Sequence, residues 1–201
     1  MKKSAAVFAC FFLLLFPVFC ISASARDKPD AEDIKRMSTF LSNFTEATFF
    51  EITDVNSLTR DELVFFGIQH NYINNFKSRI KKCPVKNCEH GPFVIEEKWV
   101  KESLKKYFDI DFKDITGQDD PDSMMYYDGK LYHFREAEGG IVYYVQVQSF
   151  FEEGGLLQVK GHLYNSEDKQ DIPALLRAVV KPHTFGGKKT WALLSLETLW
   201  N

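Results

Sequence analysis

The first group of side chains with chemistry to offer is an imidazole and two amides in one predicted helix. His70, Asn71 and Asn74 fall within residues 60–80, where apolar residues recur at helical spacing. Solvated helix faces are usually rich in Glu, Lys and Arg, whereas Asn is a poor helix former. Two interpretations stay open for this face: hydrogen bonding to a neighbouring loop, or binding of a ligand or partner by His70, Asn71 and Asn74.

The second group lies on the polar side of predicted strands in the C-terminal half. Apolar and polar residues alternate there, which indicates strands with one buried and one wetter face. If these strands are neighbours, Tyr144 and Tyr164 stand on the wetter face with Gln146, Gln148, Gln158, Lys160, His162 and Arg177. An ordinary solvated face explains these residues, and so does a ligand site that includes Gln146, Lys160 and His162.

The third group is a pair of cysteines separated by four residues. Cys83 and Cys88 are the cysteines that remain if Cys10 and Cys20 leave with a signal peptide. In an oxidising compartment so close a pair is expected to form a disulfide that pins the Pro84–Asn87 turn. Half of a metal site is the alternative, but no second Cys pair or His pair stands at metal-ligand spacing. The sequence therefore predicts a disulfide and assigns no metal.

The fourth group is the acidic stretch from Asp109 to Asp122. Oxygen-rich loops can bind Ca²⁺, but the stretch lacks the spacing of an EF-hand loop. A solvated loop is the simpler interpretation, and cation binding stays open.

Motifs for phosphate, dinucleotide, serine-hydrolase and zinc-protease chemistry are absent from the sequence. The five histidines are scattered, without a catalytic spacing to a Cys, Asp or Glu. We therefore assign no catalytic residue and no cofactor, although a site assembled across the fold is not visible in a sequence.

The elements that must position these groups belong to a single predicted α+β domain over residues 26–201. Amphipathic helices are expected at 31–48, 60–80 and 96–108, with a short strand at 91–95 before the third helix. Six strands are expected at about 123–127, 130–136, 141–150, 155–164, 174–181 and 189–198, separated by turns that include Asp128-Gly129. We expect three N-terminal helices packed on one curved antiparallel meander of about five to six strands.

The N-terminus predicts export from a bacterial cell. Lys2 and Lys3 precede an apolar stretch and then Ala23-Ser24-Ala25, which is the pattern of a signal peptide cleaved after Ala25. Lipid attachment at Cys20 is the alternative, although Phe19 replaces the small residue expected before such a cysteine. The location is thus secreted or periplasmic, with no membrane span after cleavage. The formal net charge of −3 argues against nucleic acid as the partner.

The order of helix, helix, short β segment, helix and long antiparallel meander resembles the NTF2-like superfamily over about residues 31–199. The resemblance rests on element order, and it implies a curved sheet wrapped around three helices with a pocket at the open end. The favoured function is a non-enzymatic domain that binds a small molecule or a protein partner. The alternatives are a small enzyme with His70 or His162 as acid and base, and a structural or assembly factor of the cell envelope.

Overall fold

The structure is a computed structural model that describes residues 29–113, 125–136 and 140–201. The predicted signal peptide with its cleavage point, the alternative lipid anchor at Cys20, and the acidic residues of segment 114–122 lie outside the described residues.

Three α-helices occupy the first half of the chain, close to their predicted positions. They are α1 (Ala31–Glu46), α2 (Arg60–Arg79) and α3 (Glu97–Phe108), with a short 3-10 helix, η1 (Val55–Ser57), before α2. A capping box opens α2: the Thr59 side chain accepts from the Glu62 backbone and the Glu62 side chain accepts from the Thr59 backbone. Local sequence therefore sets where these helices start, because the caps satisfy amides that have no partner within the helix.

Four long strands form a regular antiparallel meander at the C-terminal end. They are β5 (Tyr143–Glu153), β6 (Leu156–Asn165), β7 (Ala174–Phe185) and β8 (Lys188–Trp200), in the order β5-β6-β7-β8. The β5–β6 and β7–β8 turns contain Gly154-Gly155 and Gly186-Gly187, which all have positive φ. Alternation along the strands places one set of side chains in the core: Val145, Val147, Val159, Leu163, Leu176, Ala178 and Val180.

Four short strands form a second antiparallel sheet that the sequence did not predict. They are β1 (Ile80–Lys82), β2 (Phe93–Glu96), β3 (Met125–Tyr127) and β4 (Leu131–Phe134), in the order β1-β2-β4-β3. The single meander of five to six strands is thus wrong. The strands predicted at 123–127 and 130–136 correspond to β3 and β4. Strand β4 pairs with β2 and with β3, and neither β3 nor β4 joins the C-terminal sheet. Alternation identifies a strand, but it does not specify which sheet the strand joins.

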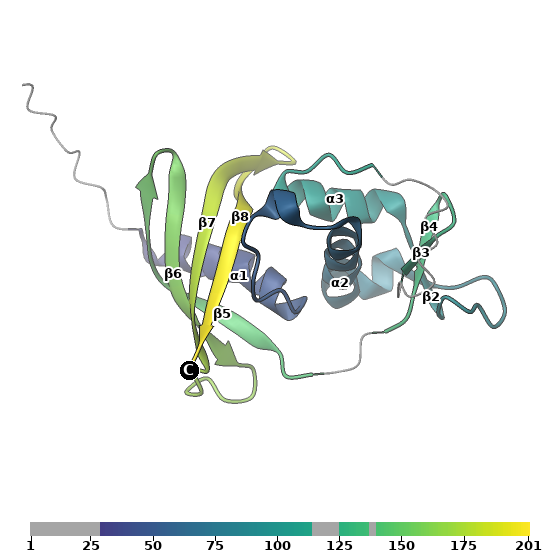
Figure 1. Cartoon of the computed structure of the whole chain (residues 1–201), viewed down its shortest axis with the longest axis horizontal. Helices are drawn as coiled ribbons and strands as arrows, with labels where there is room; N and C mark the ends of the chain where they lie inside the picture. The colour runs from purple at the N-terminus through teal and green to yellow at the C-terminus, as the bar shows by residue number, and fades with distance from the viewer. Residues whose placement is uncertain (1–28, 114–124, 137–139) are drawn as a thin grey trace, which may run out of the picture.

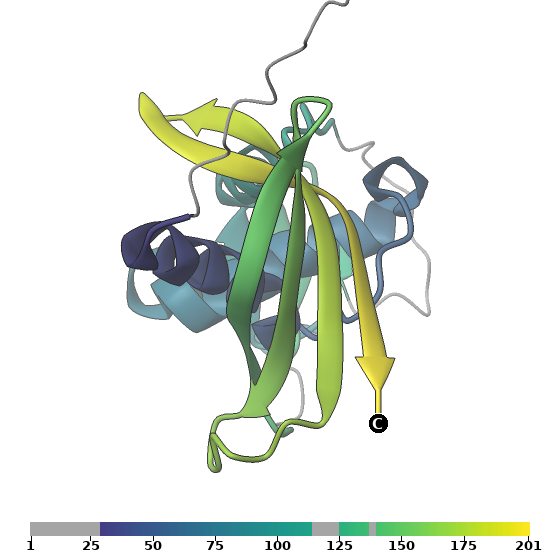
Figure 2. The same cartoon turned by 90° about the vertical axis from the view of Figure 1, so that its left-hand side faces the viewer.

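The two sheets lie on opposite sides of α2 and α3 (Figure 1). The α1 helix packs instead along β5, and α3 also contacts β8. Figure 2 shows the C-terminal sheet in front, with the helices behind it. The expected packing of three helices on one sheet is therefore replaced by a layer of helices that buries apolar residues against two sheets.

The edge of β5 is covered by hydroxyl groups of α1. Ser42 and Ser38 accept hydrogen bonds from the backbone N–H groups of Val145 and Val147, at 2.9 and 3.0 Å, and Thr45 donates to the carbonyl of Tyr143 at 2.7 Å. An uncovered edge strand is a template for pairing with another chain, so these contacts block edge pairing along this part of β5. In the described part of the chain, no helix is both long and apolar enough to cross a membrane.

Candidate binding site

The polar face predicted on α2 is turned inward against α3. His70, Asn71 and Gly67 are buried, whereas Ile73 and Phe76, assigned by helical periodicity to the apolar face, are 45% and 38% exposed. A Cβ atom at Gly67 would lie 2.6 Å from Cγ1 of Val100, so glycine permits the close approach of the two helices. The polar face is therefore an interface between helices. The expectation that the apolar face is buried and the polar face solvated is wrong for this part of α2.

Both ring nitrogens of His70 have partners on α3. Its Nδ1 atom lies 2.9 Å from Oγ of Ser103, and its Nε2 atom lies 3.1 Å from the hydroxyl oxygen of Tyr107. Burial, helped by the positive charges of Lys106 and Arg79, lowers the pKa of His70 to about 3. His70 is thus neutral near pH 7, and its hydrogen-bonding capacity is used within the protein.

Asn71 is completely buried and joins the same network. Its amide nitrogen donates to the carbonyls of Gly67 and Trp99 and to Oγ of Ser103, at 2.7, 3.1 and 2.9 Å. Its oxygen accepts from Arg79 at 3.0 Å, and Arg79 also forms a 2.8 Å ion pair with Glu102. This arrangement agrees with the structural interpretation, with the partners on α3 instead of a loop.

Asn74 lies at the margin of this interface and is exposed. Its amide donates to the His70 carbonyl at 3.1 Å and approaches the Asn43 side-chain oxygen at 3.5 Å. Of the three α2 residues proposed for binding, only Asn74 is open to solvent.

The second predicted group does come together, on the outer face of the β5–β8 sheet. Backbone register places Gln146 opposite His162 and Lys160 opposite Arg177, and Gln148 donates toward Nδ1 of His162 at 3.3 Å. The rings of Tyr144 and Tyr164 lie on the same face, 5.7 Å apart. Alternation was a reliable guide here because a strand places every second side chain on one face.

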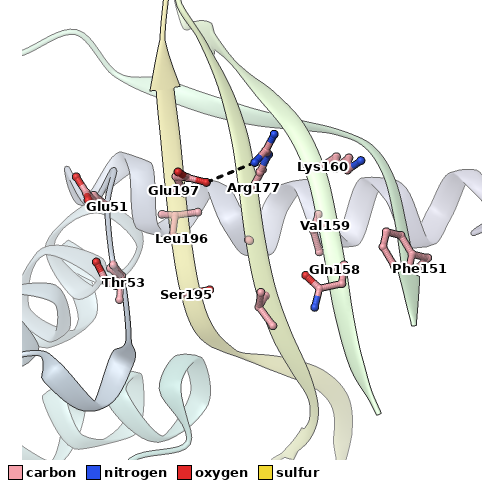
Figure 3. A pocket seen from close by; sticks show the side chains of 13 residues that line it. Glu51, Thr53, Phe151, Gln158, Val159, Lys160, Arg177, Ser195, Leu196 and Glu197 are labelled. Atoms are coloured by element: carbon pink, nitrogen blue, oxygen red, sulfur yellow. Dashed lines mark ion pairs between the residues drawn. The ribbon is translucent and has the colours of Figure 1, made fainter. Parts of the chain in front are cut away.

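Part of this face is hollowed into a groove of about 490 Å³, which we call the sheet groove (Figure 3). Its lining forms two rows across the strands. One row is Phe151, Gln158, Val179 and Ser195, and the other contains Lys160, Arg177 and Glu197. Gln146 and His162 lie beyond the groove on the same face, so only Lys160 of the three predicted sheet residues lines it.

The far wall of the groove comes from a segment that is distant in sequence. Ile52 and Leu196 exchange two backbone hydrogen bonds of 2.8 Å, which attaches residues 51–53 to the edge of β8. Glu51 and Thr53 therefore flank the groove. Neither residue was predicted from the sequence, because a single β-bridge leaves no periodic signal.

The charges in the groove are incompletely paired. Arg177 and Glu197 approach only to 3.9 Å, and their side chains are 65% and 55% exposed. Lys160 forms no ion pair with any residue that the structure describes. Like charges directly opposite each other destabilise a sheet, so Lys160 beside Arg177 is an arrangement that an anion would relieve.

Exposed apolar side chains surround this cationic pair. Phe151 is 42% exposed in the groove. Leu175 and Leu199, opposite each other on β7 and β8, are 50% and 40% exposed, and Leu175 also lies opposite His162. Positive charge flanked by apolar surface suits a ligand that is both anionic and apolar.

Cys83 and Cys88 are free thiols, so the predicted disulfide is absent from the structure. The sequence placed them correctly in one turn but missed the side chain between them. His133, from β4, directs Nδ1 at both sulfur atoms, 3.4 Å from each. The three residues form a cluster of metal-ligating type, which the sequence did not predict because His133 is 45 residues from Cys88.

Of the acidic stretch, the structure describes Asp109, Asp111 and their neighbours up to residue 113. Asp109 pairs with Lys105 and Lys181, each at 2.8 Å, and these hydrogen bonds lower the pKa of Asp109 to about 2. Its carboxylate thus links α3 to β7 instead of standing free for a cation.

Comparison with known proteins adds no relative. No family model matches the chain, and no curated protein or solved structure was found to be similar to it. The function must therefore be inferred from the geometry of the described residues.

Proposed function

We propose that this protein is a binding domain whose ligand is an amphipathic anion held on the outer face of the β5–β8 sheet. The observation that carries the proposal is the cationic pair Lys160 and Arg177 in a groove that also exposes Phe151. Lys160 was predicted as a ligand-binding residue from sequence, and Arg177 was predicted to share its face.

Charge favours an anionic head group. An anion between Lys160 and Arg177 would receive charge-assisted hydrogen bonds, which contribute about 1.5–3 kcal/mol each. Glu51 and Glu197 lie at the β8 side, so the anionic group belongs near the centre of the sheet and a polar, neutral or cationic part belongs near β8. A ligand with two separated anionic groups is disfavoured.

Size and apolar surface favour a small organic molecule. The groove volume of about 490 Å³ falls within the roughly 300–1,000 Å³ typical of small-molecule sites. Phe151 and Val179 offer an apolar wall on one side of the cationic row, and Leu175 and Leu199 lie on the other. Neither His70 nor His162 lines this groove, so the proposal includes no acid–base step.

We also propose that the domain acts outside the cytoplasm after cleavage following Ala25, and that it is an NTF2-like variant. The first proposal rests on the signal-peptide pattern in the sequence. The second is supported by three helices that precede a four-stranded antiparallel meander, with β1-β2-β4-β3 as an addition that the resemblance does not imply. Intact mass and N-terminal sequencing of exported protein, expected to begin at Arg26, test the first.

Thermal shift measurement tests the binding proposal directly. Wild-type protein would be screened against medium-chain fatty acids, aryl carboxylates and N-acyl amino acids, each with its neutral amide as the matched compound. We expect a saturable rise in Tm with an acid and not with its amide. The double variant Lys160→Gln with Arg177→Gln should weaken that binding by at least tenfold, which corresponds to about 1.4 kcal/mol.

A charge-matched control separates the site from general electrostatics. Lys77→Gln with Lys82→Gln removes two exposed positive charges from α2 and β1, away from the groove. This variant should bind like wild type. If no acid in the panel raises Tm, or if binding survives the loss of Lys160 and Arg177, the proposed site is wrong.

A further inference from the structure

The Cys83, Cys88 and His133 cluster is brought together by the short sheet. Cys83 directly follows β1, and its backbone N–H donates to the Pro92 carbonyl at 2.8 Å. Gly91, just before Pro92, has φ +130°, and its N–H donates to the Cys88 carbonyl at 3.2 Å. A Cβ atom at Gly91 would collide with the Phe134 carbonyl, so the loop lies directly against the end of β4. Both thiols therefore face the same strand.

His133 is held in one orientation from its other side. Its Nε2 atom lies 3.0 Å from one carboxylate oxygen of Asp128. The other oxygen of Asp128 accepts from the backbone N–H groups of Lys130 and Leu131, at 2.8 and 2.7 Å. The hairpin turn at Asp128-Gly129, which the sequence predicted, thus also fixes the imidazole. With its Nε2 proton donated to Asp128, the ring presents the lone pair of Nδ1 to the two sulfurs.

We propose that Cys83, Cys88 and His133 bind a thiolate-preferring divalent metal ion, zinc in the first place, with Asp128 orienting the histidine. Zinc binds sulfur at about 2.3 Å and imidazole nitrogen at about 2.0–2.1 Å in a tetrahedral site, which separates the N and S atoms by roughly 3.5 Å. The two observed Nδ1–Sγ distances are both 3.4 Å, and the three ligand atoms lie within 4.8 Å of one another.

Two equal distances are what a metal ion shared by both sulfurs requires. One lone pair on Nδ1 accepts well from one thiol, so an ordinary S–H···N bond would bring one sulfur closer than the other. A metal ion instead places both sulfurs at the same distance from the nitrogen. The pairing of His133 with a carboxylate is also the usual outer contact of a metal-bound histidine.

Three protein ligands leave one tetrahedral position for water or an external ligand. His90 is in the same loop, but its ring stacks on Tyr126 with 4.0 Å between centroids and is outside the cluster. The site would join the β1–β2 loop to β4 in a sheet whose strands are only three or four residues long. A bound ion would therefore cross-link strands that few ladder hydrogen bonds hold together.

Cobalt(II) is the probe for this site, because bound thiolates give it intense near-ultraviolet charge-transfer bands and a tetrahedral site gives visible bands. Full-length protein, reduced and then freed of reductant and metal, would be titrated with Co²⁺. We expect one equivalent to bind with both sets of bands, and one equivalent of Zn²⁺ to remove them. Asp128→Asn should weaken Co²⁺ binding by about 10–100-fold while keeping the bands.

Two histidine variants form a matched pair. His133→Asn should abolish the charge-transfer bands, whereas His90→Asn, in the adjacent loop, should keep them with unchanged stoichiometry. Because His133 is buried and its variant could misfold, Cys88→Ser supplies a second test in a solvent-accessible loop. Circular dichroism should be unchanged, Co²⁺ binding should weaken, and at least half of the charge-transfer intensity should be lost.

The result that overturns the proposal is clear-cut. The proposal is wrong if wild-type protein has two titratable thiols but shows no cobalt charge-transfer band. It is also wrong if the bands keep their full intensity in Cys88→Ser or disappear in His90→Asn. Purified wild-type protein that lacks free thiols after denaturation in a chelator, and stays metal-free after reduction, would establish the disulfide instead.

Discussion

The polar face of α2 and the outer face of the C-terminal sheet look equally suited to binding in the sequence, yet the fold uses them in opposite ways. His70 and Asn71 lie in the contact between α2 and α3, with their polar atoms paired inside the protein. Lys160 and Arg177 remain exposed, and their charges are poorly matched. Residue type separates the two faces. Amides and neutral imidazole can be buried when fully hydrogen-bonded, whereas a lysine is buried only with a partner.

The largest expected effect comes from a variant that disrupts the buried hydrogen-bond network between α2 and α3. Asn71→Ala removes contacts to Gly67, Trp99 and Ser103 and leaves Arg79 without one acceptor. We expect a loss of about 3 kcal/mol in the free energy of unfolding, because unpaired buried groups cost about 1–3 kcal/mol each. Urea denaturation followed by circular dichroism measures it.

Asn74→Ala is the matched control for that variant. It changes the same residue type one turn further along α2, where the side chain is exposed. We expect a loss below about 1 kcal/mol. Equal losses in the two variants would mean that the α2–α3 network does not stabilise the protein in the way described.

The next prediction concerns pH. The folded-state pKa of His70 is about 3, below its ordinary value of 6.5. Below pH 6.5, His70 is therefore protonated in the unfolded chain but stays neutral in the folded chain. The free energy of unfolding thus decreases as pH falls from 6.5 toward 3. Between pH 7 and pH 5 the expected contribution is a loss of about 2 kcal/mol, at 1.36 kcal/mol per pKa unit.

Comparison with His70→Gln isolates this effect from other titrating groups. Other groups affect wild type and variant alike, so the stability advantage of wild type over His70→Gln should shrink by about 2 kcal/mol between pH 7 and pH 5. Urea midpoints at four or five pH values would show it. A constant difference would indicate that the pKa of His70 is the same in the folded and unfolded states.

The smallest expected effect is on the open face. Lys160→Gln with Arg177→Gln should change the unfolding free energy by less than about 0.5 kcal/mol, because both groups are exposed and the Arg177–Glu197 pair is loose. An unchanged urea midpoint together with lost ligand binding would show that Lys160 and Arg177 serve binding, whereas Asn71 serves stability. A large destabilisation would assign this face a structural role as well.

The fold was predictable wherever the signal is local. The capping box at Thr59 and Glu62, the Gly turns of the meander and the alternation along β5 to β7 are each set by neighbours in the chain. The second sheet was not predictable as a sheet. A short strand was predicted at 91–95, close to β2, but β1 is only three residues long, too short for alternation to identify it.

The same limit explains the sites. Lys160 and Arg177 could be placed on one face because a strand has period two, but the wall formed by Glu51 and Thr53 depends on a single bridge at Ile52. Cys83 and Cys88 were visible as a pair, and Asp128-Gly129 as a turn. Their meeting at His133 required strands β2 and β4 to pair.

By itself, the sequence determined the helices, most strands, the turns and the polar surface of the C-terminal sheet. These follow from local backbone preferences and from the periods of helix and strand. The tertiary structure alone decided that the strands divide into two sheets, that the polar face of α2 is buried, and that two thiols share an imidazole. Contacts between residues far apart in the chain, and the need to pair buried polar groups, settle those outcomes, and no local pattern encodes them.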